Sequence, residues 1–154
     1  MSDTPEARLA AAGFSIPTPA APIAAYVPTV IAGGLLHISG QVSQADGAII
    51  TGRVGADMDV EAGKAAAETC GLMLIAQMKA ALGDLSRVER IVKLGGFVTS
   101  AADFTGQPEV VNGASELMLL AFGEAGRHAR SAVGVPALPR GAAVEVDAIV
   151  AIRD

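Results

Sequence analysis

Aromatic residues are scarce in this sequence, and the scarcity limits the kind of core it can build. They make up 3% of the 154 residues, although 51% of the residues are hydrophobic. The apolar content is therefore mostly Ala, Val, Leu and Ile, which pack by close approach of backbones, and the 18 glycines suit such packing. A chain of this length fits one core, so we expect residues 1–154 to form a single domain.

Long hydrophobic runs and a secretory signal are also missing. Every apolar run ends well short of the ~20 residues that a membrane span needs, so we expect no membrane placement. The segment from Met1 to Ala12 carries Asp3, Glu6 and Arg8 and lacks a basic start followed by an apolar stretch. The location expected from this pattern is the cytoplasm.

Basic charge is in deficit. Eleven Lys and Arg stand against 16 Asp and Glu, which leaves a formal net charge of −5. Phosphate backbones select the opposite balance, so nucleic acid is disfavoured as the main ligand, although a local basic pocket stays open.

Motifs for metals, nucleotides and reactive thiols are absent. The chain has no C-x-x-C, no H-x-x-x-H, no Asp-rich loop, no P-loop and no G-x-G-x-x-G. We therefore expect no metal and no cofactor. The single cysteine, Cys70, lies in an apolar helical stretch and is predicted to be a small core residue.

Histidine and serine offer few candidates for chemistry. His37 lies within an apolar strand and is predicted to be a packed core or interface residue, while His128 lies in a glycine-flanked turn and is predicted to be exposed. Ser39 and Ser131 lack the G-x-S-x-G turn or neighbouring base of a nucleophile, so both are interpreted as structural.

The remaining pattern predicts strands and helices in the order ββαβαββ. Prolines between Gly13 and Pro28 predict an extended lead-in over residues 1–24. Glycine turns, helical spacing and β-branched runs then delimit the elements: strands within 29–42 around Gly33-Gly34, a helix over 60–82, a strand over 88–99 with a bulge at Gly95-Gly96, a helix over 108–122, and strands over 130–135 and 143–152. This order predicts an α+β fold, a sheet with two helices packed on one face. The other face needs cover, which copies of the same chain could provide.

Arg130 is the strongest candidate for a functional residue. It opens the otherwise uncharged strand ARSAVGV, where a lone guanidinium needs an anion. On the last predicted strand, Glu145 and Asp147 lie on the face opposite the apolar residues. From the residues alone, a salt bridge from Arg130 to Glu145 or Asp147 is favoured over a bound ligand.

Four stretches give the chain a resemblance to a known family. They are AYVPTV, LLHISGQV, ALGDLSRVERIVKLGGFV and ARSAVGVPALPRGAAVEVDAIVAI, within Ala25 to Ile152. The chain resembles the RidA (YjgF-like) family, also called endoribonuclease L-PSP, whose fold is similar to that of the small trimeric chorismate mutases. The resemblance implies a homotrimer with pockets between subunits, and hydrolysis of 2-imino or 2-enamino acids to 2-oxo acids and ammonia.

The same resemblance implies the site residues. Arg130 corresponds to the arginine that binds the substrate carboxylate, and Ala132 lines the same pocket. Glu145 corresponds to the acidic residue that positions or activates water. Three further residues match pocket positions of the family: Tyr26, Gly40 and Asn112.

The sequence departs from the family pattern in four places. The loop between Asp103-Phe104 and Asn112 is about four residues longer than in the best-known members. The correspondence of Asn112 to the family's asparagine is therefore the least specific of these matches. Ala132 occupies the place of a reactive cysteine, so thiol chemistry is excluded there. The double glycine Gly95-Gly96 and Pro28 indicate a divergent branch.

Two other functions stay open. The same pocket could bind a small 2-oxo acid or a related metabolite without turnover, as a sensor or buffer. A ribonuclease, the activity in the family's older name, is disfavoured by the acidic balance, the single tyrosine and the absence of a basic run.

Overall fold

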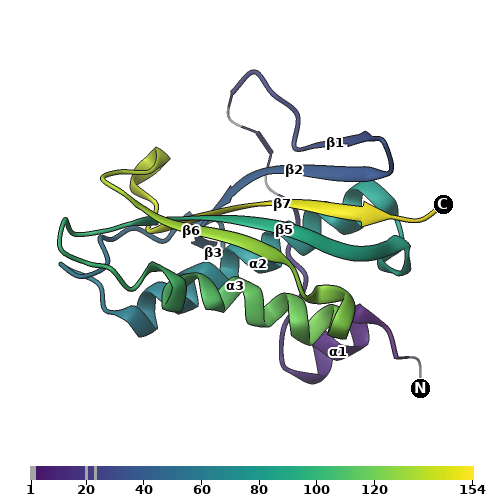
Figure 1. Cartoon of the computed structure of the whole chain (residues 1–154), viewed down its shortest axis with the longest axis horizontal. Helices are drawn as coiled ribbons and strands as arrows, with labels where there is room; N and C mark the ends of the chain where they lie inside the picture. The colour runs from purple at the N-terminus through teal and green to yellow at the C-terminus, as the bar shows by residue number, and fades with distance from the viewer. Residues whose placement is uncertain (1–2, 20, 23) are drawn as a thin grey trace.

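The computed structural model describes residues 3–19, 21–22 and 24–154. They form an α+β fold in which a mixed sheet lies on two long helices (Figure 1). The five-stranded sheet has the order β1-β2-β7-β5-β6, and a two-stranded hairpin, β3-β4, lies beside it. The strands of both are β1 Thr29–Ala32, β2 Leu35–Val42, β3 Gln44–Ala45, β4 Ala48–Ile49, β5 Val88–Thr99, β6 Ala129–Val135 and β7 Val144–Ile152. Pairing is antiparallel throughout except between β5 and β6, which are parallel.

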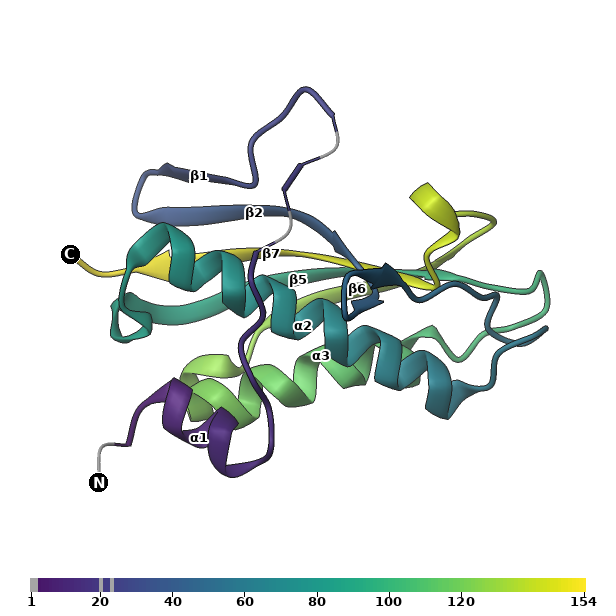
Figure 2. The same cartoon turned by 180° about the vertical axis from the view of Figure 1, so that it is seen from behind.

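Two long helices, α2 (Val60–Leu82) and α3 (Gln107–Phe122), cover one face of the sheet (Figure 2). Helix α2 begins where the Asp59 carboxylate accepts a hydrogen bond from the Ala62 amide at 2.8 Å, and it ends at Gly83 with φ 78°. Both boundaries are those predicted from the sequence. Helix α3 starts with a proline in its first turn, where a missing amide hydrogen costs nothing. The prediction of two helices on one face is confirmed.

A short helix, α1 (Pro5–Ala11), corrects the prediction of an extended lead-in over residues 1–24. The Thr4 hydroxyl accepts from the Ala7 amide at 3.1 Å and caps its start, and Pro5 lies in its first turn. Leu9 is fully buried in the core, and Arg8 donates to the Ala121 carbonyl at the end of α3 at 2.9 Å. A seven-residue helix is stable here because of this packing, which local sequence does not reveal.

The core lies between the sheet and α2 and α3 and is built from small and aliphatic side chains. Cys70 is fully buried there, its thiol 3.5 Å from the Val144 carbonyl, and burial raises the pKa of that thiol. The prediction of a small core cysteine is confirmed. Val144, Val146, Ala148 and Val150 of β7 all point into this core.

The two glycine pairs, Gly33-Gly34 in a turn and Gly95-Gly96 in a strand, have different roles. Gly33 and Gly34 join β1 to β2 with φ 60° and 75°, the left-handed pair of a tight hairpin that was predicted. The predicted bulge at Gly95-Gly96 is wrong, because these residues pair in continuous register with Asp147 and Val146. They serve close approach instead: a Cβ at Gly95 would meet the Asp147 carboxylate, and one at Gly96 would meet the Val111 side chain of α3.

The face of the sheet opposite the helices has no cover within the described chain (Figures 1 and 2). Cross-strand registers place Val133, Phe97 and Glu145 in one row across this face, and Lys93, Ile149, His37 and Val30 in another. Val30 and Val133 are 51% and 45% exposed. Exposed aliphatic side chains on a sheet face are the kind of surface that association buries.

Candidate functional site

Arg130 lies on the edge strand β6 and points toward α3. Its Nη1 donates to Asn112 Oδ1 at 2.8 Å and to Ser115 Oγ at 3.1 Å, and its Nη2 donates to the Pro108 carbonyl at 3.3 Å. Asn112 and Ser115 are three residues apart on α3 and so share one face of the helix. Ala132, two residues further along β6, packs on the same side against the core.

These bonds leave one edge of the Arg130 guanidinium available. Both hydrogens of Nη1 are used, whereas Nε donates to no described residue and Nη2 keeps one hydrogen. Donor hydrogens on Nε and Nη2 together can bind a carboxylate through two bonds. The guanidinium is therefore held from one side and open on the other.

A hydrogen-bond chain behind Arg130 runs through Ser115 to His128. Nδ1 of His128 lies 2.6 Å from the Gly126 carbonyl, which can only accept, so Nδ1 carries the proton. Burial lowers the pKa of His128, and the charge of Arg130 adds to this effect. Neutral Nε2, 2.9 Å from Ser115 Oγ, then accepts the serine proton, and the oxygen lone pairs of Ser115 face Arg130. His128 is half-buried, which corrects the prediction that it is exposed.

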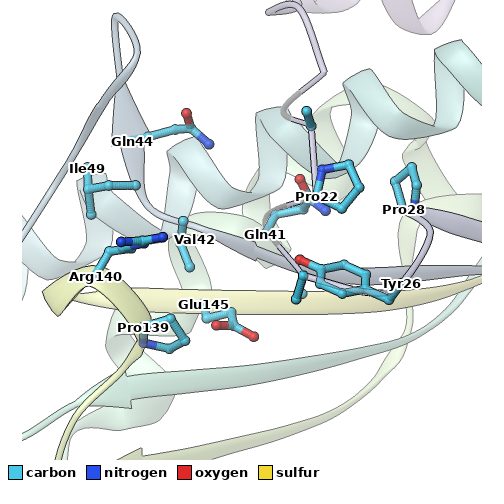
Figure 3. Close-up of a pocket in the computed structure, with 13 residues that line it drawn as sticks. Pro22, Tyr26, Pro28, Gln41, Val42, Gln44, Ile49, Pro139, Arg140 and Glu145 are labelled. Atoms are coloured by element: carbon cyan, nitrogen blue, oxygen red, sulfur yellow. The ribbon is translucent and has the colours of Figure 1, made fainter.

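A second group of candidate residues lines a pocket of about 810 Å³ on another part of the chain. Tyr26, Gly40 and Glu145 all contribute to it, from the segment before β1, from β2 and from β7. Figure 3 shows Glu145 between Tyr26 at one end of the pocket and Arg140 at the other. Most of the remaining lining is apolar, with several prolines.

Gly40 makes room for Glu145. A Cβ at position 40 would overlap the Glu145 carboxylate, so only glycine lets that group lie against β2. The ladder between β2 and β7 shifts register between Ile38 and Gln41, which places Gly40 at the irregularity. The LLHISGQV stretch therefore sets the position of the pocket carboxylate.

Ser39 ties the segment that carries Tyr26 to β2. Its hydroxyl donates to the Val27 carbonyl at 2.8 Å, and its amide donates to the Pro28 carbonyl at 2.9 Å. Tyr26 is 46% exposed, with its ring at the pocket (Figure 3). The structural role predicted for Ser39 is confirmed.

The pKa of Glu145 lies above that of an ordinary glutamate. Burial raises its pKa, and the Asp147 carboxylate on the same face of β7 raises it further. Burial likewise raises the pKa of Asp147, against the opposing effects of the Gly95 backbone and Lys93. A carboxyl with a raised pKa in a pocket is a candidate acid or base.

The two groups of residues lie on opposite faces of the sheet. Arg130 bonds to α3 on the helix-covered face, whereas Glu145 and Asp147 project from the other face of β7. The salt bridge from Arg130 to Glu145 or Asp147, favoured from the residues alone, is therefore wrong. Strand β5 also separates β6 from β7 in the sheet.

Sequence reasoning missed two residues and one contact at these places. Ser115 could have been found from its spacing of three from Asn112 on a helix. The bond between Ser115 and His128 depends on the turn that follows α3 and has no local signal. Arg140 belongs to the PALPRG connection between the last two strands, and the sequence does not show that it borders the Glu145 pocket.

The comparison with known families settles the relationship of the chain. Residues 6–150 match the family described as "YjgF/chorismate_mutase-like, putative endoribonuclease". The chain belongs to the YjgF-like, or RidA, family. The YjgF-like match covers nearly the whole chain and agrees with the α+β fold described above.

Three relatives show where the chain lies within the RidA family. Protein TCP17 of Trypanosoma cruzi is 53% identical over 150 residues, which cover 96% of this chain and 94% of that protein. The crystal structure of a protein of unknown function from Agrobacterium tumefaciens is 49% identical, covers 99% of this chain and 95% of its own, and superposes with a TM-score of 0.92. RidA from a Psychrobacter species is 27% identical over 90% of this chain and 97% of its own, with a TM-score of 0.60. The gap between 0.92 and 0.60 supports a branch divergent from RidA itself.

Two further properties concern the described residues only. Among them, no cluster of three or more His, Cys, Asp or Glu side chains could hold a metal ion. No helix in the same part of this RidA-family chain is both long and apolar enough to cross a membrane.

Proposed function

We propose that the protein hydrolyses small 2-imino and 2-enamino acids to 2-oxo acids and ammonia, at sites shared between subunits of a homotrimer. Each site would take Arg130, Asn112 and Ala132 from one subunit and Tyr26 and Glu145 from its neighbour. The observation that carries the proposal is the Arg130 guanidinium, which is fixed through Nη1 and keeps donor hydrogens on Nε and Nη2. These donors suit the carboxylate common to all these substrates.

A trimer is proposed because one chain supplies two incomplete groups. The carboxylate binder and the candidate base lie on opposite faces of the sheet, so they cannot act on one small molecule within one subunit. The uncovered sheet face, with Val30 and Val133 exposed, supplies the surface for association. Burying this face between copies would bring the β6 edge of one subunit to the pocket of the next.

The chemistry needs only positioned groups and water. The substrate iminium carbon is electron-poor, and a water oxygen adds to it while the Glu145 carboxylate accepts the water proton. The electrons of the C=N bond move to nitrogen and give a carbinolamine. Glu145 returns the proton to that nitrogen and, again a carboxylate, accepts the hydroxyl proton as the C–N bond breaks and C=O forms. Ammonia leaves, and Glu145 passes the remaining proton to water or to the ammonia. The reaction as written needs no metal or organic cofactor.

The direct test generates iminopyruvate from serine with a pyridoxal-phosphate lyase and follows its decay. Added protein is expected to accelerate the decay, and Arg130→Ala and Glu145→Gln are each expected to abolish the acceleration. An unchanged decay rate, in an assay where an active family enzyme accelerates it, would contradict the proposal.

Calorimetry on the same variants distinguishes the enzyme from the second candidate, a binding protein without turnover. Both functions require Arg130 for binding a 2-oxo acid. Only the enzyme requires Glu145 for turnover. Its Glu145→Gln variant should lose the acceleration and still bind the 2-oxo acid. Binding of the 2-oxo acid with no acceleration by the unaltered protein would favour the binding protein.

A further inference from the structure

Arg140 is a second cation at the Glu145 pocket, separate from Arg130. It lies in the β6–β7 connection and lines the pocket together with Val42, Gln44 and Ile49. Figure 3 shows its side chain reaching toward Val42, across the pocket from Tyr26. The proposed reaction gives this arginine no task, because the substrate carboxylate is assigned to Arg130 of the partner subunit.

No described residue neutralises Arg140. It takes part in none of the ion pairs and donates no side-chain hydrogen bond within the part of the chain that the structure describes. Glu145 is the carboxylate among the lining residues, yet its pKa is raised by burial and Asp147 rather than lowered by a cation. A counterion role of Arg140 toward Glu145 is thus not supported.

The backbone at Arg140 is held in an unfavourable conformation. Its φ of 61° and ψ of 16° lie in the left-handed region that glycine adopts freely and other residues rarely. The turn is fixed by bonds from the Gly141 amide to Leu138 at 3.1 Å and from the Ala142 amide to Pro139 at 3.2 Å. An arginine kept where glycine or asparagine would be relaxed, at the border of a pocket, suggests a use for its side chain.

The pocket is also larger than a three-carbon imino acid needs. Its volume of about 810 Å³ lies in the range of sites for drug-sized ligands. Apolar side chains, including Val42 and Ile49, lie on the Arg140 side of it (Figure 3). This arrangement suits a short methylene chain that ends in a negative group.

We propose that Arg140 forms a subsite for a second acidic group, so that the preferred substrates are imines of dicarboxylic amino acids. This inference rests on the proposed function, because it uses Arg130 of the partner subunit for the first carboxylate. The side-chain carboxylate would then extend past Glu145 to the Arg140 guanidinium. Arg140 acts here in specificity and takes no part in the proton transfers.

The test compares two 2-oxo acids of five carbons as ligands, 2-oxoglutarate and 2-oxovalerate, by calorimetry on the full-length protein. They share the first carboxylate and differ in the second. The protein is expected to bind 2-oxoglutarate about three- to tenfold more tightly, the effect of one partly solvated charge pair. In Arg140→Gln this ratio is expected to fall to about one, whereas the control Arg127→Gln, which removes an equal charge outside the pocket, should keep it.

A second variant controls for loss of folding in Arg140→Gln. Arg140→Gly relieves the left-handed backbone, so its melting temperature should equal or exceed that of the unaltered protein while the preference is lost. Equal affinities for both oxo acids, or a preference that survives in Arg140→Gln and Arg140→Gly, would overturn the subsite and leave the proposed function intact. Failure of the unaltered protein to bind either oxo acid would overturn both.

Discussion

The hydroxyl oxygen of Ser115 lies 2.9 Å from Nε2 of His128 and 3.1 Å from Nη1 of Arg130. Ser115 thus connects a histidine of fixed tautomer to the guanidinium that we assign to carboxylate binding. The arrangement makes His128 a positioning residue that acts on the ligand only through Ser115 and Arg130.

Replacing His128 should weaken carboxylate binding without removing it. His128→Ala deletes the acceptor of the Ser115 proton, and we expect the Kd for a 2-oxo acid to rise about three- to tenfold, the value of one hydrogen bond. His128→Gln places an acceptor near the position of Nε2 and should restore most of the affinity. Calorimetry checks both variants, and equal losses in the two would show a merely structural role.

The close contact of Gly40 with Glu145 gives a second prediction. Gly40→Ala places a methyl group where the Glu145 carboxylate lies, so the carboxylate must move and turnover should fall at least tenfold. A double-mutant cycle with Glu145→Asp, which keeps a carboxylate on a shorter side chain, tests the mechanism through kcat. If Gly40 acts through Glu145, adding Gly40→Ala to Glu145→Asp lowers kcat less than adding it to the unaltered protein; fully additive losses would refute the link.

The neighbouring carboxylates Glu145 and Asp147 predict a pH effect. Glu145 must be ionised to accept the water proton, and its raised pKa places the acid limb of kcat/KM above the ordinary glutamate value of 4.5. Asp147→Asn removes a negative charge that raises this pKa, so the limb should move to lower pH. A pH–rate profile measures the shift, with Asp103→Asn, an exposed carboxylate outside the pocket, as the control. A limb that stays in place or moves upward would contradict this role of Asp147.

Much of the fold was predictable because its signals are local. Helix α2 is bounded by Asp59 and Gly83, whose capping roles are readable from residue type, and the Gly33-Gly34 turn fixes its hairpin. Helix α1 was missed because its stability comes from burying Leu9 against distant elements. The misplaced bulge at Gly95-Gly96 has a similar cause, since these glycines are needed for contacts with β7 and α3.

The candidate site was harder to predict because it depends on which face of the sheet each residue takes. Arg130 and Glu145 were each recognisable as charged residues in apolar strands. Their separation is a property of the strand order, with β5 between β6 and β7, and no local pattern encodes it. Ser115 and His128 meet only after the chain turns from α3 into β6.

The claim on which the whole account depends is that Arg130 and Glu145 act together across a subunit boundary. The most direct measurement co-expresses Arg130→Ala and Glu145→Gln chains with different affinity tags, purifies assemblies that carry both tags, and measures imine hydrolysis. A mixed trimer of either composition has one complete site, which takes intact Arg130 from the Glu145→Gln chain and intact Glu145 from the Arg130→Ala chain. About a third of the unaltered activity should therefore return. Mixed trimers as inactive as either variant alone, beside a fully active doubly tagged unaltered trimer, would contradict the shared site.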